Sequence, residues 1–314
     1  MMKWALVAVM FLAAAPARAD GIWFNGGAKG TVGTEEYRGV DASAQIGGDS
    51  FSIRPMFSEY SSTATVGTFK TASVRLGYDT NIFGIGVTGG GTPRVNGYSN
   101  VFGGVDAVLS FTPGSGGPMR RITPSQGSAG GARGEGLTRI DLGVSFMHTA
   151  HRDSFQAHDA GQVGLRGPAG TLTVNPRSSA FTIGQNDLTG SVGIKLLGLL
   201  FSGSFTKTVY DKDLAANLVR ALPVERLSGQ DVTTQGMPDT NTAFRAEMDQ
   251  LPLITPWASY VHTRYKLGQN NSNAVSVGLN VELSILEVVA SIEHLAQVGA
   301  ADRNYMSLGA NIRF

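Results

Sequence analysis

The sequence predicts an all-β fold: a closed, antiparallel transmembrane β-barrel of about 12–14 strands with one long, partly helical insertion. Three observations support this prediction. Apolar residues recur at every second position along much of the chain. The alternating runs are about 9–11 residues long, the length that a tilted strand needs to cross a bilayer. The opposite face holds mostly Ser, Thr, Gly and Asn, which suits a crowded polar interior better than a surface facing water.

The composition excludes several other classes of protein. Glycine makes up 42 of the 314 residues, about twice its usual share. Only 16% of the residues are charged and the net charge is +1, so the clustered Lys and Arg of a nucleic-acid-binding protein are missing. There is no cysteine, which excludes disulfide frameworks, thiolate zinc sites and cysteine nucleophiles. We therefore expect an apolar, glycine-rich sheet with no nucleic-acid partner.

The first residues have the plan of a secretory signal peptide. Met1-Met2-Lys3 gives a positive start, residues 4–15 are apolar, and Ala17-Arg18-Ala19 forms a small-residue cleavage site. The apolar run is shorter than the about 20 residues that a membrane-spanning helix needs. We predict that residues 1–19 are a signal peptide cleaved after Ala19 and that residues 20–314 form the barrel.

The clearest strand lies near residues 275–285. Its alternating apolar residues are Val275, Val277, Leu279, Val281, Leu283 and Ile285. Residues one apart in a strand point to opposite faces, so these side chains share one face. The same alternation occurs over residues 72–78, 101–111, 140–146, 188–196 and 201–205, and turn-forming residues such as 47–50 and 79–81 separate the runs.

Two segments interrupt the alternation. Residues 113–136 are rich in Gly, Pro, Ser and Arg, which predicts a flexible loop. Residues 211–252 are long and mixed, and within them 213–222 has a helix-like pattern that stops at Pro223. This insertion is either a cap over the barrel mouth, a constriction folded into the lumen, or a surface loop.

The number of strands is constrained by two similar turns. Leu197-Gly198 and Leu286-Glu287 are both tight and apolar, as are turns on the periplasmic side of a barrel. Two turns on one side must have an even number of strands between them, whereas the alternation gives three. Either a further strand lies near residues 242–248, or residues 211–252 return through the lumen.

The last strand carries a resemblance to a known family. Met306, Leu308, Ala310, Ile312 and Phe314 alternate after Tyr305, and the chain ends on the aromatic ring of Phe314. This pattern resembles the C-terminal insertion signal of bacterial outer-membrane β-barrel proteins. The resemblance implies an even number of strands, both termini in the periplasm, and insertion by the barrel-assembly machinery among outer-membrane lipids and lipopolysaccharide. Closure follows independently, because an open sheet edge in lipid leaves backbone groups without hydrogen bonds.

Charged side chains on the predicted inward faces are candidates for the lining of a pore. They are Arg54, Arg75, Asp106, Arg139, Asp141, Lys195, His262, Arg264, Lys266, Glu282 and Glu293. The basic members could bias the pore toward anions. Pairing with the acidic members is the favoured role for most of them, because a buried unpaired charge is costly.

A histidine cluster is a weak candidate for a metal site. His148, His151, Asp153 and His158 supply imidazole and carboxylate ligands within a short span. Their spacing matches no fixed metal motif. A solvated polar loop is therefore the favoured explanation of these residues, and we expect no cofactor.

Two further patterns have structural explanations. Residues 84–89 match G-x-G-x-x-G, but Thr92-Pro93 follow where a nucleotide-binding fold would begin a helix. Aromatic residues near the predicted strand ends could form the belts at the two membrane interfaces or simply pack along the strands. These residues are Tyr37, Tyr60, Tyr78, Trp257, Tyr265 and Phe314.

The function that the sequence favours is a passive, porin-like channel or transporter for small solutes in the bacterial outer membrane. A close alternative is a transporter of hydrophobic compounds, as in the fatty-acid class, and a polar or apolar lumen would separate the two. A third possibility is a structural or adhesive barrel without a pore. A barrel enzyme acting on lipid would need a serine near His148, but no G-x-S-x-G occurs, so we expect no enzymatic activity.

Overall fold

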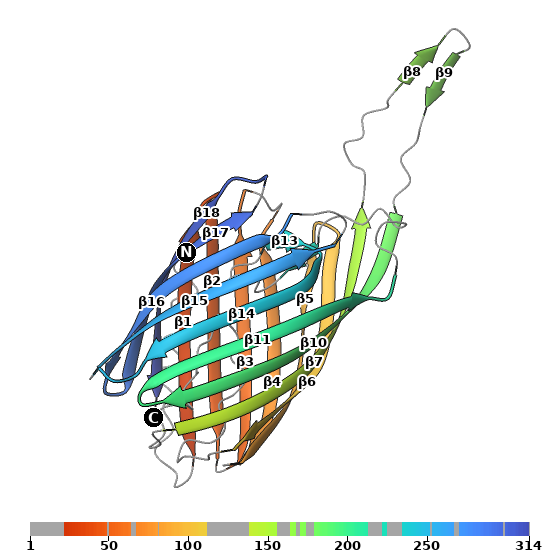
Figure 1. The fold of residues 1–314 in the computed structure, drawn as a ribbon. Coiled ribbons are helices and arrows are strands. Elements are labelled where there is room, and N and C mark those ends of the chain that lie inside the picture. Colours follow the sequence, from red (N-terminus) through yellow and green to blue (C-terminus); the bar gives the residue numbers. More distant parts are fainter. Residues whose placement is uncertain are drawn as a thin grey trace.

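The fold is a closed β-barrel of 14 strands, shown in Figure 1. The structure, a computed structural model, describes residues 22–48, 50–63, 67–80, 82–111, 138–155, 164–167, 170–173, 179–212, 222–224, 234–251, 253–266, 270–297 and 299–313. The predicted signal peptide, the predicted loop over 113–136 and the helix-like residues 213–221 lie outside these ranges. Leu222, the last residue of the helix-like segment, begins a short strand instead. Among the described residues, no helix has the length and apolar character to cross a membrane.

The strands of the barrel follow one another around the sheet. In chain order they are β1 (Trp23–Gly33), β2 (Tyr37–Gly47), β3 (Phe51–Ser61), β4 (Phe69–Asp79), β5 (Phe83–Val95), β6 (Tyr98–Ser110), β7 (Thr138–Phe155), β10 (Ser179–Leu196), β11 (Leu199–Tyr210), β14 (Pro238–Met248), β15 (Ile254–Tyr265), β16 (Ser272–Leu283), β17 (Leu286–Gln297) and β18 (Arg303–Arg313). Two small hairpins pair only with themselves, β8 (Gly164–Gly167) with β9 (Gly170–Thr173) and β12 (Leu222–Val224) with β13 (Thr234–Gly236).

The barrel closes where β1 pairs with β18. Their antiparallel register runs from Asn25 opposite Arg313 to Gly33 opposite Tyr305. The first and last strands therefore bring both described ends of the chain to one rim, which we call the terminal end. The opposite rim, where the chain turns between β1 and β2, is the far end. Closure leaves no sheet edge unpaired, as a wall in lipid requires.

A strand fills the gap in the predicted strand count. The segment near residues 242–248 is part of β14, which pairs with β11 and β15. Four strands, β11, β14, β15 and β16, therefore lie between the turn at 197–198 and the turn at 284–285. The first of these turns has positive φ angles at Leu197 (48°) and Gly198 (78°), as tight hairpin turns require. The even strand number is confirmed.

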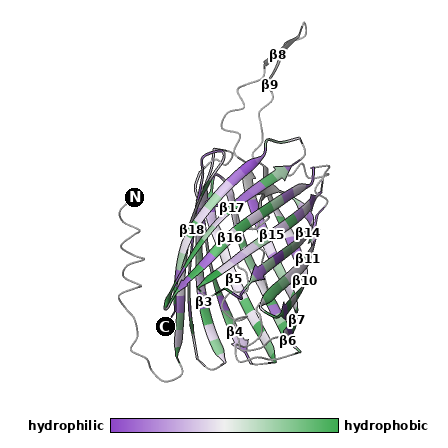
Figure 2. Ribbon diagram, turned by 60° about the vertical axis from the view of Figure 1, so that its left-hand side comes forward, coloured by the Kyte–Doolittle hydropathy of each residue, from purple (hydrophilic) through white to green (hydrophobic). Residues whose placement is uncertain are grey.

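The two faces of the wall differ in the predicted way. Val275, Val277 and Leu279 of β16 are exposed on the outer face, while Ser276 between them is buried. Green and purple alternate along the strands in Figure 2 for the same reason. In a closed sheet the buried set faces the lumen, so the exposed apolar set forms the outer wall.

The outer wall changes from apolar to polar at a common height. On β7 the outward residues Ile140, Leu142, Val144 and Phe146 are followed by His148. On β18 the outward residues Leu308 and Met306 are followed, toward the far end, by Asn304. Residues 140–148 span about 26 Å of strand, or about 20 Å with the usual strand tilt, close to the apolar band of known barrels. The outer wall therefore matches the thickness of a membrane.

Candidate functional site

The lumen is the candidate site, because its wall carries the polar side chains. Hydroxyl groups bond to each other across neighbouring strands, as in Thr31 with Ser307 (2.8 Å) and Thr71 with Thr92 (2.7 Å). In these pairs each hydroxyl has its hydrogen-bond partner on the neighbouring strand. These short side chains therefore stay close to the barrel wall. The lining is thus hydrophilic at these positions.

An arginine crosses a strand to reach an aspartate. Arg75 on β4 donates to Asp106 on β6 from Nε (3.0 Å) and Nη2 (2.6 Å). Between them lies Gly86 of β5, where a Cβ would stand 2.2 Å from Arg75 Nη2. Gly77, Gly86 and Asp106 are consecutive partners across the three strands. The G-x-G-x-x-G match at 84–89 is therefore part of a strand, and one of its glycines makes room for a guanidinium.

Further ion pairs line the terminal half of the lumen. They join Arg139 to Asp141 (2.9 Å), Arg245 to Glu247 (2.6 Å), Lys195 to Asp249 (3.3 Å), and Arg313 to both Glu287 (3.1 Å) and Glu282 (3.8 Å). Glu293 accepts a hydrogen bond from Ser276 (2.7 Å), and Arg54 Nη2 lies 3.5 Å from Ser43 Oγ. Each of the predicted lumen residues in this group faces inward and has a partner. This is the pairing role that the sequence favoured, rather than a bias of the pore toward anions.

Five members of this array were not among the residues predicted from the sequence, and one of them, Asp249, directly follows β14. Arg245, Glu247, Glu287 and Arg313 share the inward face of their strands with small polar residues. Alternation along β14, β17 and β18 would have identified these four once the strands were aligned. Arg245 also lies with its guanidinium carbon 3.8 Å from the ring centre of Trp257, a cation–π contact. Trp257 therefore points into the lumen.

The middle of the lumen is more open along β1 and β2. Lys29 and Asp41 are direct partners on these strands, with their charged atoms 3.9 Å apart. Their side chains remain 19% and 31% exposed although they face inward, against 4% and 3% for Arg139 and Asp141. Water therefore reaches the wall at β1 and β2, while the side chains near β7 are packed.

The predicted inward direction of the basic residues on β15 is wrong. Val261 and Thr263 are buried in the lumen, whereas His262 and Arg264 lie on the outer face. His262 Nδ1 pairs with Asn273 Oδ1 at 2.8 Å on that face. The sequence placed the apolar residues of this strand against lipid, but Trp257 and Val261 can equally make contacts in the interior, and apolar character alone does not decide between the two faces. Lys266 follows the strand and lies 3.5 Å from Asp239 at the far end.

A ring of apolar side chains surrounds the far end of the lumen, and we call it the apolar collar. Its aromatic members are Tyr37, Tyr60, Phe69, Tyr98 and Tyr305. Its aliphatic members are Ile183, Met237, Ala243, Val261, Ala274 and Leu295. All of them are buried in one connected cluster, with exposures between 0% and 6%. The large rings lie on one side of the barrel, and the small side chains of β14–β17 lie on the other.

The aromatic members contact one another around the wall. Tyr60 stacks on Phe69 with ring centres 5.2 Å apart, and Tyr37 meets the edge of Tyr305 at 5.3 Å. Gly33 lies between Tyr37 and Tyr305 in the sheet, and a Cβ there would stand 2.3 Å from the Tyr305 ring. The missing side chain lets the two rings meet across β1.

The aromatic residues are only partly where the interface belts were expected. Tyr37, Tyr60 and Trp257 face the lumen, so for these three the alternative of packing along the strands holds and the belts do not include them. Tyr37 shares its face with Gly39, Asp41 and Ser43, a signal that the sequence did contain. Tyr78 does lie on the outer wall at the terminal end, against Phe51 (4.8 Å) and Phe83 (5.9 Å). Tyr265 bonds to Ser272 Oγ (2.9 Å), and Phe314 is outside the described residues.

The histidines proposed as metal ligands lie on opposite faces. His148 is on the outer wall, where Nδ1 lies 2.8 Å from Asn186 Oδ1. His151 is inside, within hydrogen-bond distance of Tyr98 Oη (2.8 Å) and Gln185 Oε1 (3.1 Å). An odd spacing along a strand produces this separation. His158 and the side chain of Asp153 fall outside the described part, within which no group of three metal-ligating residues gathers.

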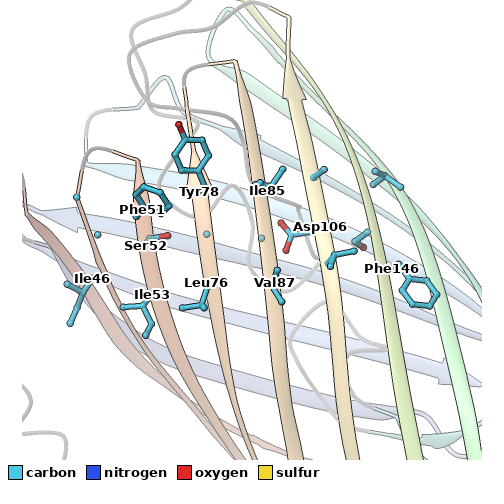
Figure 3. Close-up of a pocket in the computed structure, with 18 of the residues that line it drawn as sticks. Ile46, Phe51, Ser52, Ile53, Leu76, Tyr78, Ile85, Val87, Asp106 and Phe146 are labelled. Atoms are coloured by element: carbon cyan, nitrogen blue, oxygen red, sulfur yellow. The ribbon is translucent and has the colours of Figure 1, made fainter.

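A shallow groove of about 920 Å³ crosses the outer wall from β2 to β10. Figure 3 shows Ile46, Ile53, Leu76 and Val87 in a row across four neighbouring strands, and Asp106 also borders the groove. The lining is apolar and belongs to the band that matches the membrane. The groove is therefore part of the outer wall.

Comparison with known proteins finds distant structural likenesses only. No family model and no curated protein matches the chain. CdiB from Acinetobacter baumannii superposes with a TM-score of 0.49 at 8% identity over 94% of this chain, which spans 60% of that one. The CymD monoaromatic hydrocarbon channel gives 0.47 at 7% identity over 95% and 89% of the two chains. OccK10 (OpdN) from Pseudomonas aeruginosa gives 0.42 at 10% identity over 94% and 98%.

These values are too low to transfer a function, so the assignment rests on the strand pairing and the two faces of the wall. The chain is a closed, 14-stranded barrel of the outer-membrane type.

Proposed function

We propose that the protein is a passive channel for small solutes in the bacterial outer membrane. The main support is the inward pair Lys29–Asp41, which remains partly exposed to solvent in the middle of the barrel. A barrel whose interior served only as a core would bury such a pair completely. Polar side chains next to the pair, such as Thr31 and Ser43, line the same inward face of β1 and β2.

The outer wall supports the proposed location. Beyond its apolar band, neighbouring strands carry outward polar pairs at the far end, such as Lys207 with Asp239 (2.7 Å) and Lys70 with Glu59 (3.5 Å). This rim suits contact with the phosphates and sugars of lipopolysaccharide if the far end faces outward. The signal peptide would direct export, and the alternating β18 would be recognised by the barrel-assembly machinery.

The charges of the lumen point to weak ion selectivity. Most lumen cations that were predicted from sequence have an acidic neighbour, as Arg75 has Asp106 and Arg139 has Asp141. Paired charges cancel beyond a few ångströms, so they line a pore without a strong field. We therefore expect the channel to discriminate between solutes mainly by size and hydration.

One observation favours a second candidate, a transporter of hydrophobic compounds. Tyr210 and Met237 border the connection over 211–237, and both belong to or pack against the apolar collar. An apolar zone beside this insertion is what the fatty-acid-type alternative predicts. The exposed ionic middle of the lumen argues for the small-solute channel as the main function.

Planar-bilayer recording tests the proposal. Purified protein should insert with stepwise currents that persist without any energy source. Ser43→Trp on β2 places a large ring in the lumen and should reduce the current, while Ala42→Trp places the same ring on the outer face and should not. If no current flows at any voltage, the protein is a barrel without a pore and the proposed channel function is wrong. Equal reduction by both variants would show that the ions do not pass through this lumen.

A further inference from the structure

We infer that the inward pair Lys29–Asp41 is a binding subsite for small zwitterions, such as α-amino acids, on their way through the lumen. This inference rests on the proposed channel function and names the class of solute that the channel favours. The two side chains carry opposite charges at directly opposite positions of β1 and β2 and point into the barrel. A zwitterion carries the two complementary charges on one small molecule.

The pair lies in an open part of the lumen wall. Toward the far end, Thr31 and Ser307 are buried, with exposures of 3% and 6%. Around the pair itself, inward residues of β18, β1, β2 and β3 remain partly exposed. We call this part of the wall the open recess and define it by Lys29, Asp41, Ser43, Arg54, Met56 and Gly309.

Small neighbours leave room beside the two charges. Gly309 is the direct partner of Lys29 on β18, and a Cβ there would stand 3.0 Å from Lys29 Cβ. On the other side of the pair, Asp41 is opposite the short side chain of Ser58 on β3. The sheet neighbours of the pair are thus a glycine and a serine, so both charged groups can be reached from the lumen.

The pair is also loose. Its charged atoms are 3.9 Å apart, which is longer than a hydrogen bond. The packed lumen pairs are closer, with 2.9 Å between Arg139 and Asp141. An ion pair that remains in contact with water contributes little to stability. Exchanging the contact between Lys29 and Asp41 for contacts with a solute therefore costs little.

The charges of an α-amino acid fit this recess. Its ammonium and carboxylate groups are attached to the same carbon, so they are close enough together to meet both ends of the pair. Asp41 would accept hydrogen bonds from the ammonium group, and Lys29 would donate to the carboxylate. Arg54, whose Nη2 lies 3.5 Å from Ser43 Oγ, is a second donor beside the pair. Met56, opposite Ser43, offers an apolar contact to the side chain of the solute.

The same arrangement disfavours other solutes of equal size. An anion is attracted by Lys29 but repelled by Asp41, and a cation meets the reverse combination. An uncharged solute gains neither attraction, so the difference in affinity favours the zwitterion. Contacts with accessible charges are weak enough for the solute to leave again, as a channel requires. The subsite therefore adds a preference to the selection by size and hydration.

Swelling of proteoliposomes tests the preference. L-Alanine and lactamide are isomers, but only alanine carries two charges. The ratio of their entry rates should fall by about two- to fivefold in Lys29→Gln combined with Asp41→Asn, the order that an exposed ion pair supports. The swapped variant, Lys29→Asp combined with Asp41→Lys, should keep the ratio, because a zwitterion can bind it in the opposite direction.

A pair on the outer face provides the matched control. Lys70→Gln combined with Glu59→Gln removes an exposed ion pair outside the lumen and should leave the ratio unchanged. Heat-dependent gel mobility shows whether each variant is folded. An unchanged ratio in the neutral lumen variant, or its loss in a folded swapped variant, would contradict the subsite. If the swapped variant does not fold, Asp41→Asn alone decides, and it should lower the ratio as well.

Protection of a single thiol measures binding apart from transport. The chain has no cysteine, and Ser43→Cys places one thiol on the inward face of β2 next to Asp41. L-Alanine should slow the reaction of this thiol with an uncharged methyl thiosulfonate in the detergent-solubilised barrel, and lactamide should not. Adding Lys29→Gln and Asp41→Asn should abolish the protection.

The two measurements separate the subsite from the channel. If alanine protects the thiol but no solute enters the proteoliposomes, the subsite stands and the channel function fails. If both solutes enter, and neither their ratio nor the protection depends on the charges of Lys29 and Asp41, the channel stands and the subsite inference is wrong.

Discussion

Arg75 Nη2 lies 2.6 Å from Asp106 Oδ2 although a whole strand, β5, runs between the strands that carry them. Gly86 makes this possible, because any larger residue there would occupy the space of the guanidinium. The pair spans three strands and ties them together on the lumen side. The G-x-G-x-x-G match at residues 84–89 therefore has a structural role, because its second glycine, Gly86, lets the Arg75 side chain cross β5.

Replacing Gly86 by alanine should weaken this tie. The new methyl group would stand 2.2 Å from Arg75 Nη2, so the guanidinium must shift away from Asp106. We expect the free energy of unfolding to fall by about 1–3 kcal/mol, the usual cost of losing a partly buried charged hydrogen bond. Urea titration in lipid vesicles measures it. Gly89→Ala on the same strand meets no atom closer than 3.9 Å and should cost nothing; equal losses would show that the pair is not the cause.

Arg139→Met should be more damaging than the same change at the rim. Arg139 and Asp141 are 4% and 3% exposed and lie 2.9 Å apart, so the substitution removes the bonded cation from a buried carboxylate. Loss of one partner from a buried pair costs about 3–5 kcal/mol. Lys207→Met breaks an exposed pair with Asp239 and should cost about 0–1 kcal/mol. Unfolding midpoints that fall equally would contradict the burial of the Arg139 pair.

Single charge changes at the open middle should alter ion selectivity. Asp41→Asn leaves Lys29 beside the water path without this acidic neighbour and should shift the reversal potential toward anion preference. Lys29→Gln should shift it in the opposite direction. Lys70→Gln, which removes an outward lysine, is the control and should have no effect. Reversal potentials in a salt gradient measure all three, and shifts of one sign for both lumen variants would contradict the assignment of Lys29 and Asp41 to the path.

Much of the wall was predictable, because one physical rule governs it. Along β7 and β16, every second side chain meets lipid, so Ile140 to Phe146 and Val275 to Leu283 reveal both the strand and its outward face. Closure also required an even number of strands between two turns on one rim, which left either a further strand near residues 242–248 or a return through the lumen, and β14 is that further strand. These inferences need only the period of the chain and the requirement for closure.

The lumen was less predictable, because hydropathy does not show whether an apolar side chain faces the lumen or the lipid. On β15, Trp257 stacks on Arg245 and Val261 joins the collar, so the apolar set is the inward one. Hydropathy alone assigns such residues to the lipid. Which rings meet, as Tyr37 meets Tyr305 across Gly33, depends on closure between the first and last strands, which no local pattern contains.

The height of the outer band gives a prediction of its own. Leu308 lies on the outer face within the apolar band and is 64% exposed, so Leu308→Arg should cost about 2–4 kcal/mol of folding free energy in a bilayer. Asn304→Arg, on the same face of β18 at the far rim, should cost about 0–1 kcal/mol. Folding titrations in phospholipid vesicles provide both values. Equal costs would mean that the band does not coincide with the hydrocarbon.

The central claim is that the inward face of the wall meets water and the outward face meets hydrocarbon. Nitroxide labels at single cysteines over residues 40–44 of β2 test it in the cysteine-free chain. In bilayers, labels at Val40, Ala42 and Ala44 should be relaxed by oxygen dissolved in lipid, and labels at Asp41 and Ser43 by a water-soluble nickel chelate. A reversed alternation, or uniform access of the chelate to all five positions, would contradict the account.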